Sequence, residues 1–121
     1  MAWEVEVSDT FTAWFRELED DERRSVAVGV DLLEQEGPTL PFPLSSRISQ
    51  SRHGSMRELR IQHRGRPYRV LYAFDPRRTA FLILGGDKTG DDRWYDRNVP
   101  RADREFDEHL RTLKQEGLID G

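Results

Sequence analysis

Six arginines and one glutamate lie between residues 51 and 72, and they are the side chains best suited to binding chemistry in this sequence. Two alternating runs flank the dipeptide Arg64-Gly65, and a glycine at the second loop position suits the positive φ of a two-residue hairpin turn. In the register that this turn sets, Arg60 lies opposite Arg69. The sequence therefore predicts two guanidinium groups side by side on one face of a sheet.

Like charges directly opposite each other destabilise a sheet, so another group must offset the pair. One candidate is Glu58, two residues before Arg60 on the same face and diagonal to Arg69. It would form a structural Arg-Glu-Arg cluster. The other candidate is an anionic ligand, with Glu58 as a group that tunes the site. Both alternatives stay open from the sequence.

Three consecutive strands are expected to carry these residues, over 56–63, 66–75 and 79–86. The turn between the second and third strands begins at Asp75-Pro76, with proline at its favoured first central position. The third strand contains an unbroken apolar run, which is typical of an interior strand covered by helices on at least one side.

The first part of the chain predicts a strand over 3–7 at the edge of the sheet, followed by two helices. Ser8 and Asp9 can cap the first helix. The second follows the acidic run 19–22 and ends at Gly37-Pro38. The two helices should form an antiparallel hairpin. Carboxylates suit a helix start, and no histidine cluster accompanies them, so a metal site is not expected there.

A loop without periodicity is expected over 37–55, pinned to the core by Leu40, Phe42 and Leu44. Its second half brings three basic side chains close to the start of the hairpin, namely Arg47, Arg52 and His53. Loops beside a binding face often carry function.

After the third strand, the glycine-rich loop 85–90 presents Lys88 and is expected to bind an anion. Its glycine spacing, with Asp87 before the lysine, excludes an ATP-binding P-loop. A polar loop over 91–99 should then present Arg93, Trp94 and Tyr95, before Pro100 opens a helix that docks on the sheet. Residues 117–121 are expected to fray.

The length of 121 residues predicts one domain over 1–121. The chain has no cysteine, and neither a membrane span nor a leader is recognisable, so a cytoplasmic location is expected. The net charge of −4 argues against a general nucleic-acid binder, but residues 51–72 hold 6 bases against 1 acid. A local positive face on an acidic body can still collect phosphates.

The run ELRIQHRGRPYRVLYAFDPRR, followed by GGDKTGDDRWY and DEHL, resembles the RelE/ParE superfamily of bacterial toxins, and its HigB-like, phage-related branch in particular. The likeness covers about residues 3–116. It implies an α+β fold, with an N-terminal helical hairpin and a C-terminal helix packed on a small, mainly antiparallel sheet.

This resemblance implies a toxin of a type II toxin-antitoxin system that cleaves messenger RNA on the ribosome without a metal or other cofactor. In such toxins the ribose 2′-oxygen attacks the neighbouring phosphate, so the protein positions RNA and neutralises charge. The implied partners are the messenger RNA, the ribosome and a cognate antitoxin. That antitoxin is expected to be a helix-turn-helix protein from an adjacent gene, in a heterotetramer with the toxin.

Carried over to this sequence, the resemblance assigns the phosphate to Arg60 and Arg69, charge stabilisation to Lys88 and a downstream aromatic role to Tyr95. Six further residues are expected to bind RNA: Arg47, Arg52, His53, Arg57, Arg66 and Arg93. The alternation of the strand places His63 on the face opposite Arg60. The general base stays unassigned, because arginine is a poor base.

Two other functions fit the same fold. A ParE-like toxin that poisons DNA gyrase needs only a surface that grips the topoisomerase. A catalytically inactive module would bind its antitoxin alone, and the acidic composition favours this function slightly.

Overall fold

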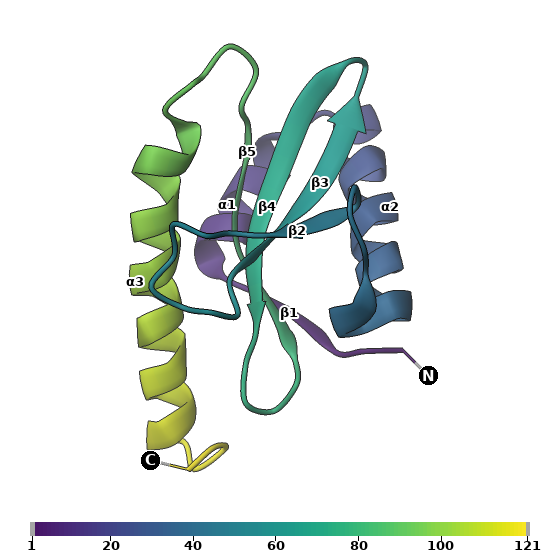
Figure 1. Cartoon of the computed structure of the whole chain (residues 1–121). Coiled ribbons are helices and arrows are strands. Elements are labelled where there is room, and N and C mark those ends of the chain that lie inside the picture. Colours follow the sequence, from purple (N-terminus) through teal and green to yellow (C-terminus); the bar gives the residue numbers. More distant parts are fainter. Residues whose placement is uncertain (1, 121) are drawn as a thin grey trace.

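The computed structural model describes residues 2–120, which form a five-stranded sheet with helices on both faces (Figure 1). The sheet has the order β1-β5-β4-β3-β2, in which β1 is parallel to β5 and the other pairs are antiparallel. The predicted α+β class is confirmed. The elements are β1 (Val5–Val7), α1 (Asp9–Glu17), α2 (Asp20–Glu36), the 3-10 turn η1 (Gly37–Thr39), β2 (Ser45–Arg47), β3 (Arg57–His63), β4 (Arg66–Phe74), β5 (Ala80–Asp87) and α3 (Trp94–Gln115).

The predicted helical hairpin is confirmed, and local capping explains both of its starts. The Ser8 side chain accepts a hydrogen bond from the Phe11 backbone N–H at 2.9 Å. Glu19 and Glu22 form a capping box at the start of α2, and Gly37 ends that helix with a φ of 59°. The acidic run is therefore a helix start, as expected.

Alternation along the strands gives the sheet two separate cores. Leu59, Val70 and Leu82 face α1 and α2, whereas Leu71 and Ile83 face α3. Figure 1 shows α3 on one side of the sheet and α1 and α2 on the other. Strand β5 is interior and apolar on both faces, as the sequence predicted.

The central hairpin has the predicted register. Arg64 and Gly65 have φ values of 51° and 78°, as a two-residue turn with positive φ at both positions requires. Arg60 lies opposite Arg69. His63 is buried against Ser25 of α2, so its expected place on the face opposite Arg60 is also confirmed.

A bulge in β5 precedes the part of the strand on which the start of α3 packs. Leu71 pairs with Leu84 but Tyr72 pairs with Leu82, so one extra residue of β5 re-aims the strand. Beyond it, a Cβ on Gly86 would lie 2.6 Å from Trp94 Nε1. Glycine therefore lets the Trp94 indole approach the sheet and fixes the start of α3.

Three expectations about the connections were wrong. The loop over 37–55 contains η1 and β2, because β2 pairs with the edge of β3. Strand β5 runs over Ala80–Asp87, as the strand expected over 79–86 predicts, so the loop expected over 85–90 begins only after Asp87. Helix α3 begins at Trp94 and includes Pro100, because the indole packs on the sheet before the proline is reached.

The C-terminal end of α3 is closed by backbone hydrogen bonds beyond its last turn. The backbone N–H groups of Gly117 and Leu118 donate to the carbonyls of Lys114 and Leu113, at 3.1 and 2.9 Å. These bonds close the helix in a Schellman motif, and the fraying expected over 117–121 stays a prediction. Gly121 of the predicted tail lies outside the described residues.

Gly86→Ala is expected to lower the free energy of unfolding by about 1–3 kcal/mol, because the added methyl group displaces the Trp94 indole. Urea denaturation measures this change. Gly54→Ala is the matched control: its Cβ would meet nothing within 4 Å. Equal effects of the two substitutions would contradict the close packing of Trp94 on the sheet.

A buried ionic cluster stabilises the opposite end of the sheet. The Asp75 carboxylate accepts hydrogen bonds from Arg77 at 2.8 Å and from His109 at 3.0 Å. Arg77 also binds Glu6 of β1. Burial alone would raise the pKa of Asp75, but the hydrogen bonds from Arg77 and His109 outweigh it and lower that pKa below 3.8.

This lowered pKa predicts a loss of stability in acid. The folded Asp75 carboxyl holds its proton less tightly than the unfolded one, so its contribution is present above about pH 4 and disappears as the pH falls. Asp75→Asn is expected to reduce the free energy of unfolding at pH 7 by about 2 kcal/mol. The variant should also show a shallower fall below pH 4. If the stability of the variant falls as steeply below pH 4 as that of the parent, the loss of stability in acid does not come from Asp75.

Candidate functional site

Glu58 is the centre of a polar cluster on the face of the sheet that α3 covers. It is buried, and Arg60 Nη1 and the Ser46 hydroxyl donate to its Oε2 at 3.3 and 2.5 Å. The Tyr95 hydroxyl donates to Oε1 at 2.5 Å. Arg69 Nε lies 3.4 Å from Oε1, an ion pair whose geometry falls short of a hydrogen bond.

The Arg-Glu-Arg cluster, one of the two alternatives from the sequence, is thus present. Both guanidinium groups share one carboxylate, so their charges are not fully neutralised by it. An anion is the natural complement of the remaining positive charge. The second alternative, an anionic ligand with Glu58 as a tuning group, stays a prediction.

Arg60 and Arg69 line an open groove of about 530 Å³. The other lining residues come from the segment before β2 and from the hairpin: Pro43, Leu44, Gln62 and Pro67. The Arg60 side chain is 29 % exposed and that of Arg69 only 5 %. Arg60 is therefore the more accessible guanidinium group for a ligand in this groove, and Arg69 lies beneath it, almost fully buried.

Tyr95 and Lys88 complete the cluster from the side of α3. Burial raises the pKa of the Tyr95 hydroxyl, and its hydrogen bond to Glu58 acts in the same direction. The phenol therefore stays protonated at neutral pH and keeps its hydrogen bond to Glu58. The Lys88 ammonium lies 5.6 Å from the centre of the Tyr95 ring, within the range of a cation–π contact. The four residues that the resemblance marked as catalytic thus lie in one connected group.

Two of the six expected RNA-binding residues are bound to α3 at a distance from this cluster. Arg52 Nη2 and His53 Nε2 each lie 2.7 Å from an oxygen of Asp107. Asp107 is 12 positions after Tyr95, about 18 Å along a helix. These contacts hold the loop after β2 against α3. Figure 1 shows this loop crossing in front of the sheet.

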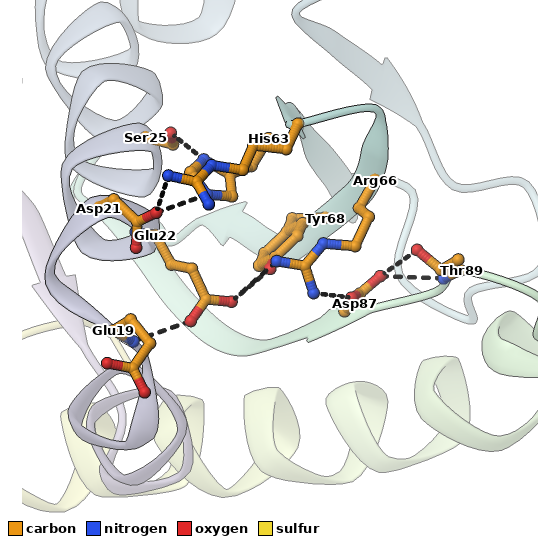
Figure 2. A network of polar contacts seen from close by, with 10 residues as sticks. Glu19, Asp21, Glu22, Ser25, His63, Arg66, Tyr68, Asp87 and Thr89 are labelled. Carbon is orange, nitrogen blue, oxygen red and sulfur yellow. Dashed lines mark hydrogen bonds and ion pairs between the residues drawn. The ribbon is translucent and has the colours of Figure 1, made fainter.

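Arg66 belongs to a second network, at the tip of the hairpin (Figure 2). It lies between Asp87 and Glu22, at 3.3 and 3.7 Å. Glu22 also accepts a hydrogen bond from the Tyr68 hydroxyl. Burial and this hydrogen bond raise the pKa of Tyr68 to about 12. The start of α2 thus neutralises much of the positive charge at the hairpin tip.

The three other basic residues also lie outside the Glu58 cluster. Arg57 donates to Ser45 at 3.0 Å, and in the sheet it lies opposite Arg47 of β2. Arg93 is exposed at the start of α3. Within residues 2–120, none of these six side chains forms a hydrogen bond or ion pair with Glu58, so their predicted part in RNA binding depends on a ligand that extends beyond the groove.

Sequence reasoning missed Ser46, which positions Glu58 from the neighbouring strand. Ser46 lies opposite Glu58 in the β2–β3 register. The only signal was the short polar run before Arg47, which does not alternate with apolar residues. Across residues 2–120, no group of three or more acidic or histidine side chains is placed to hold a metal ion, and no helix there is long and apolar enough to cross a membrane.

A family model described as "Phage derived protein Gp49-like (DUF891)" matches residues 13–107. The chain is 47 % identical over 98 residues to the candidate toxin HigB3 of Mycobacterium tuberculosis (strain ATCC 25618 / H37Rv), covering 80 % of this chain and 84 % of HigB3. The candidate toxin HigB2 of the same strain is 38 % identical over 112 residues, with 91 % of this chain but 55 % of HigB2 aligned.

Solved structures show the same fold at low sequence identity. An arginine double mutant of the E. coli toxin RelE in the free state matches with a TM-score of 0.58 at 16 % identity, over 84 % of this chain and 98 % of that one. A chain of the archaeal RelE-RelB complex from Pyrococcus horikoshii OT3 matches with a TM-score of 0.54 at 18 % identity, over 73 % and 97 %. The chain therefore belongs to the Gp49-like family of phage-derived proteins, is related in sequence to HigB3 and HigB2, and has the fold of RelE.

Proposed function

We propose that this toxin is a metal-independent endonuclease that cleaves messenger RNA on the ribosome. The observation that carries the proposal is the pair of arginines that share Glu58 at the wall of an open groove. A sugar-phosphate chain in that groove would bring one phosphate against Arg60. Arginine suits this role because its planar fork matches phosphate oxygens and is always charged.

The proposed reaction is attack of a ribose 2′-oxygen on the adjacent phosphorus. The bond from that oxygen to phosphorus forms as the bond from phosphorus to the 5′-oxygen breaks, which leaves a 2′,3′-cyclic phosphate and a 5′-hydroxyl. Arg60 and Arg69 stabilise the charge that develops on the phosphorane. The Lys88 ammonium is the donor available for the leaving 5′-oxygen, whereas the Tyr95 hydroxyl is already bonded to Glu58 and holds the cluster in place.

Glu58 is assigned a positioning role in this scheme. Its two oxygens are already engaged by Arg60, Ser46, Tyr95 and Arg69, so a further proton acceptor function would have to break one of these contacts. By holding the guanidinium and phenol groups in place, it reduces the reorganisation that the transition state requires. The group that accepts the 2′-hydroxyl proton is not assigned.

The proposed partners are the ribosome, messenger RNA and a cognate antitoxin. Related folds have been solved in toxin-antitoxin complexes, among them RelBE2 of Mycobacterium tuberculosis with a TM-score of 0.51. An antitoxin that covers the Arg60 groove would keep substrate out. We expect a helix-turn-helix antitoxin from an adjacent gene, assembled with the toxin as a heterotetramer.

Controlled induction in growing cells tests the function. The endonuclease proposal predicts that translation stops and that transcripts with new internal ends accumulate. Intact transcripts with a DNA damage response would instead favour gyrase poisoning. Normal growth, with antitoxin binding retained, would favour an inactive module, for which the partial neutralisation of the arginines by Glu58 is the supporting observation.

A further inference from the structure

Phe42 is a large apolar side chain exposed at the edge of the Arg60 groove. It is 70 % exposed, although the sequence predicted that it would pin the loop to the core. That prediction was wrong: its neighbour Leu40 is buried, whereas the Phe42 ring lies outside the core. The ring centre is 5.2 Å from the Arg60 guanidinium carbon. The Phe42 ring and Arg60, the residue proposed to bind phosphate, therefore form one continuous surface.

The backbone around Phe42 is restrained. Pro41 and Pro43 flank it, and both have a fixed φ. The Pro41 carbonyl accepts the backbone N–H groups of Leu44 and Ser45 at 2.9 and 3.0 Å. Because the Leu44 carbonyl in turn accepts the Arg60 N–H at 2.8 Å, this turn is fastened to β3. The backbone that carries the exposed ring is thus fixed before any ligand arrives, which lowers the entropy cost of binding.

Phe42 and Tyr95 lie on opposite sides of the arginine pair. Phe42 precedes β2, whereas Tyr95 lies in the first turn of α3, which docks over β5. Strands β3 and β4 lie between β2 and β5 in the sheet. Neighbouring strands are about 4.8 Å apart, so the crossing from β2 to β5 is about 14 Å. An RNA strand that crosses the sheet here, with a phosphate at Arg60, would bring an adjacent base toward Phe42.

We propose that Phe42 is a base-stacking residue, which binds an unpaired nucleobase next to the phosphate held by Arg60. This inference rests on the proposed function and extends it with a subsite. Every nucleobase presents a π-face, so the subsite should accept all four bases and favour single-stranded RNA. Arg60 would contact the same ring and the phosphate, which couples base binding to phosphate binding.

The test uses ribosomes programmed with a short messenger RNA in which one nucleotide is 2-aminopurine, whose fluorescence falls when the base stacks. A 2′-deoxy sugar at the cut position, located beforehand with the ribose form, prevents cleavage. Phe42→Ala is expected to weaken binding about 5- to 150-fold and to abolish the fluorescence change at one position. Phe42→Trp should retain both, because it keeps a π-face, whereas Phe42→Leu should behave like alanine.

Val28→Ala is the matched control, since Val28 is also an exposed apolar residue (60 %) but lies on α2. It should bind RNA as the parent does, and antitoxin binding measured in parallel shows that each variant is folded. If the parent binds RNA and Phe42→Ala binds it equally well, the stacking inference is overturned and the endonuclease proposal stands. If the parent neither binds nor cuts RNA on the programmed ribosomes, both are overturned. If Phe42→Ala weakens only antitoxin binding, Phe42 is a protein contact and the inference is again overturned.

Discussion

Arg60→Ala is expected to slow RNA cleavage about 100- to 1,000-fold, the usual effect of removing one preorganised group that stabilises transition-state charge. The Arg60 side chain is 29 % exposed, and Glu58 keeps Ser46, Tyr95 and Arg69 as partners. The variant should therefore stay folded. Cleavage of messenger RNA on programmed ribosomes measures the rate, and relief of growth arrest is the corresponding effect in cells.

Arg64→Ala is the matched control for this substitution. Arg64 belongs to the same hairpin, is 74 % exposed and pairs with Asp21 at 2.8 Å, away from the groove. It should leave the cleavage rate nearly unchanged. Lys88→Ala and Arg69→Ala should also relieve toxicity, the latter with some loss of stability because Arg69 is buried. Full toxicity of all three site variants would show that the functional surface lies elsewhere.

Glu58→Gln is expected to reduce the free energy of unfolding by about 3 kcal/mol, because it leaves the buried Arg69 charge without a carboxylate. Arg69 Nη1 donates to the Tyr68 carbonyl at 3.0 Å, but within the described residues Glu58 is the carboxylate that pairs with this guanidinium, and Nε has no hydrogen-bond partner. Urea denaturation of the parent, Glu58→Gln, Arg69→Met and the double variant gives the coupling between the two residues. A coupling of about 1–3 kcal/mol is expected.

The same Glu58 variant separates a positioning role from a catalytic one. A positioning residue lowers the cleavage rate at every pH, and the pH profile keeps its shape. A general base would instead remove the acidic limb of the profile. A coupling near zero in the denaturation cycle, together with unchanged cleavage, would contradict the central place given to Glu58.

The arginine pair was predictable from the sequence because its register depends on local chemistry. Arg64-Gly65 allows only a tight turn with positive φ, and the alternation of the flanking strands then places Arg60 opposite Arg69. The proximity of Glu58 follows from the same alternation. The helical hairpin was predictable for a similar reason, since its caps and its apolar spacing agree.

The start of α3 was not predictable, because contacts between distant parts of the chain decide it. Pro100 is a strong local signal for the first turn of a helix. The packing of Trp94 on Gly86 and the bond from Tyr95 to Glu58 nevertheless extend the helix six residues before it. Likewise, β2 has no periodicity of its own and forms only because β3 offers an unpaired edge.

The ion pairs formed by the other basic residues were also not predictable from the sequence. Arg52 and His53 meet Asp107, more than 50 positions later, and Arg66 meets Glu22, 44 positions earlier. A count of bases in the hairpin cannot reveal such partners. They explain how an acidic chain with a basic centre keeps positive charge in one groove. The acids at the start of α2 pair with the arginines of the hairpin tip (Figure 2), whereas Arg60 lies in the groove and is 29 % exposed.

Cleavage of a messenger RNA that carries a single 2′-deoxy sugar at the cut position tests the account most directly. Purified toxin is added to ribosomes programmed with this RNA or with the all-ribose form, and the ends of the fragments are mapped. The proposed reaction predicts that the ribose form is cut, with a 2′,3′-cyclic phosphate and a 5′-hydroxyl at the new ends, and that the deoxy form stays intact. Cleavage of the deoxy form at the same rate would contradict attack by the 2′-oxygen, and with it the role proposed for the arginine groove.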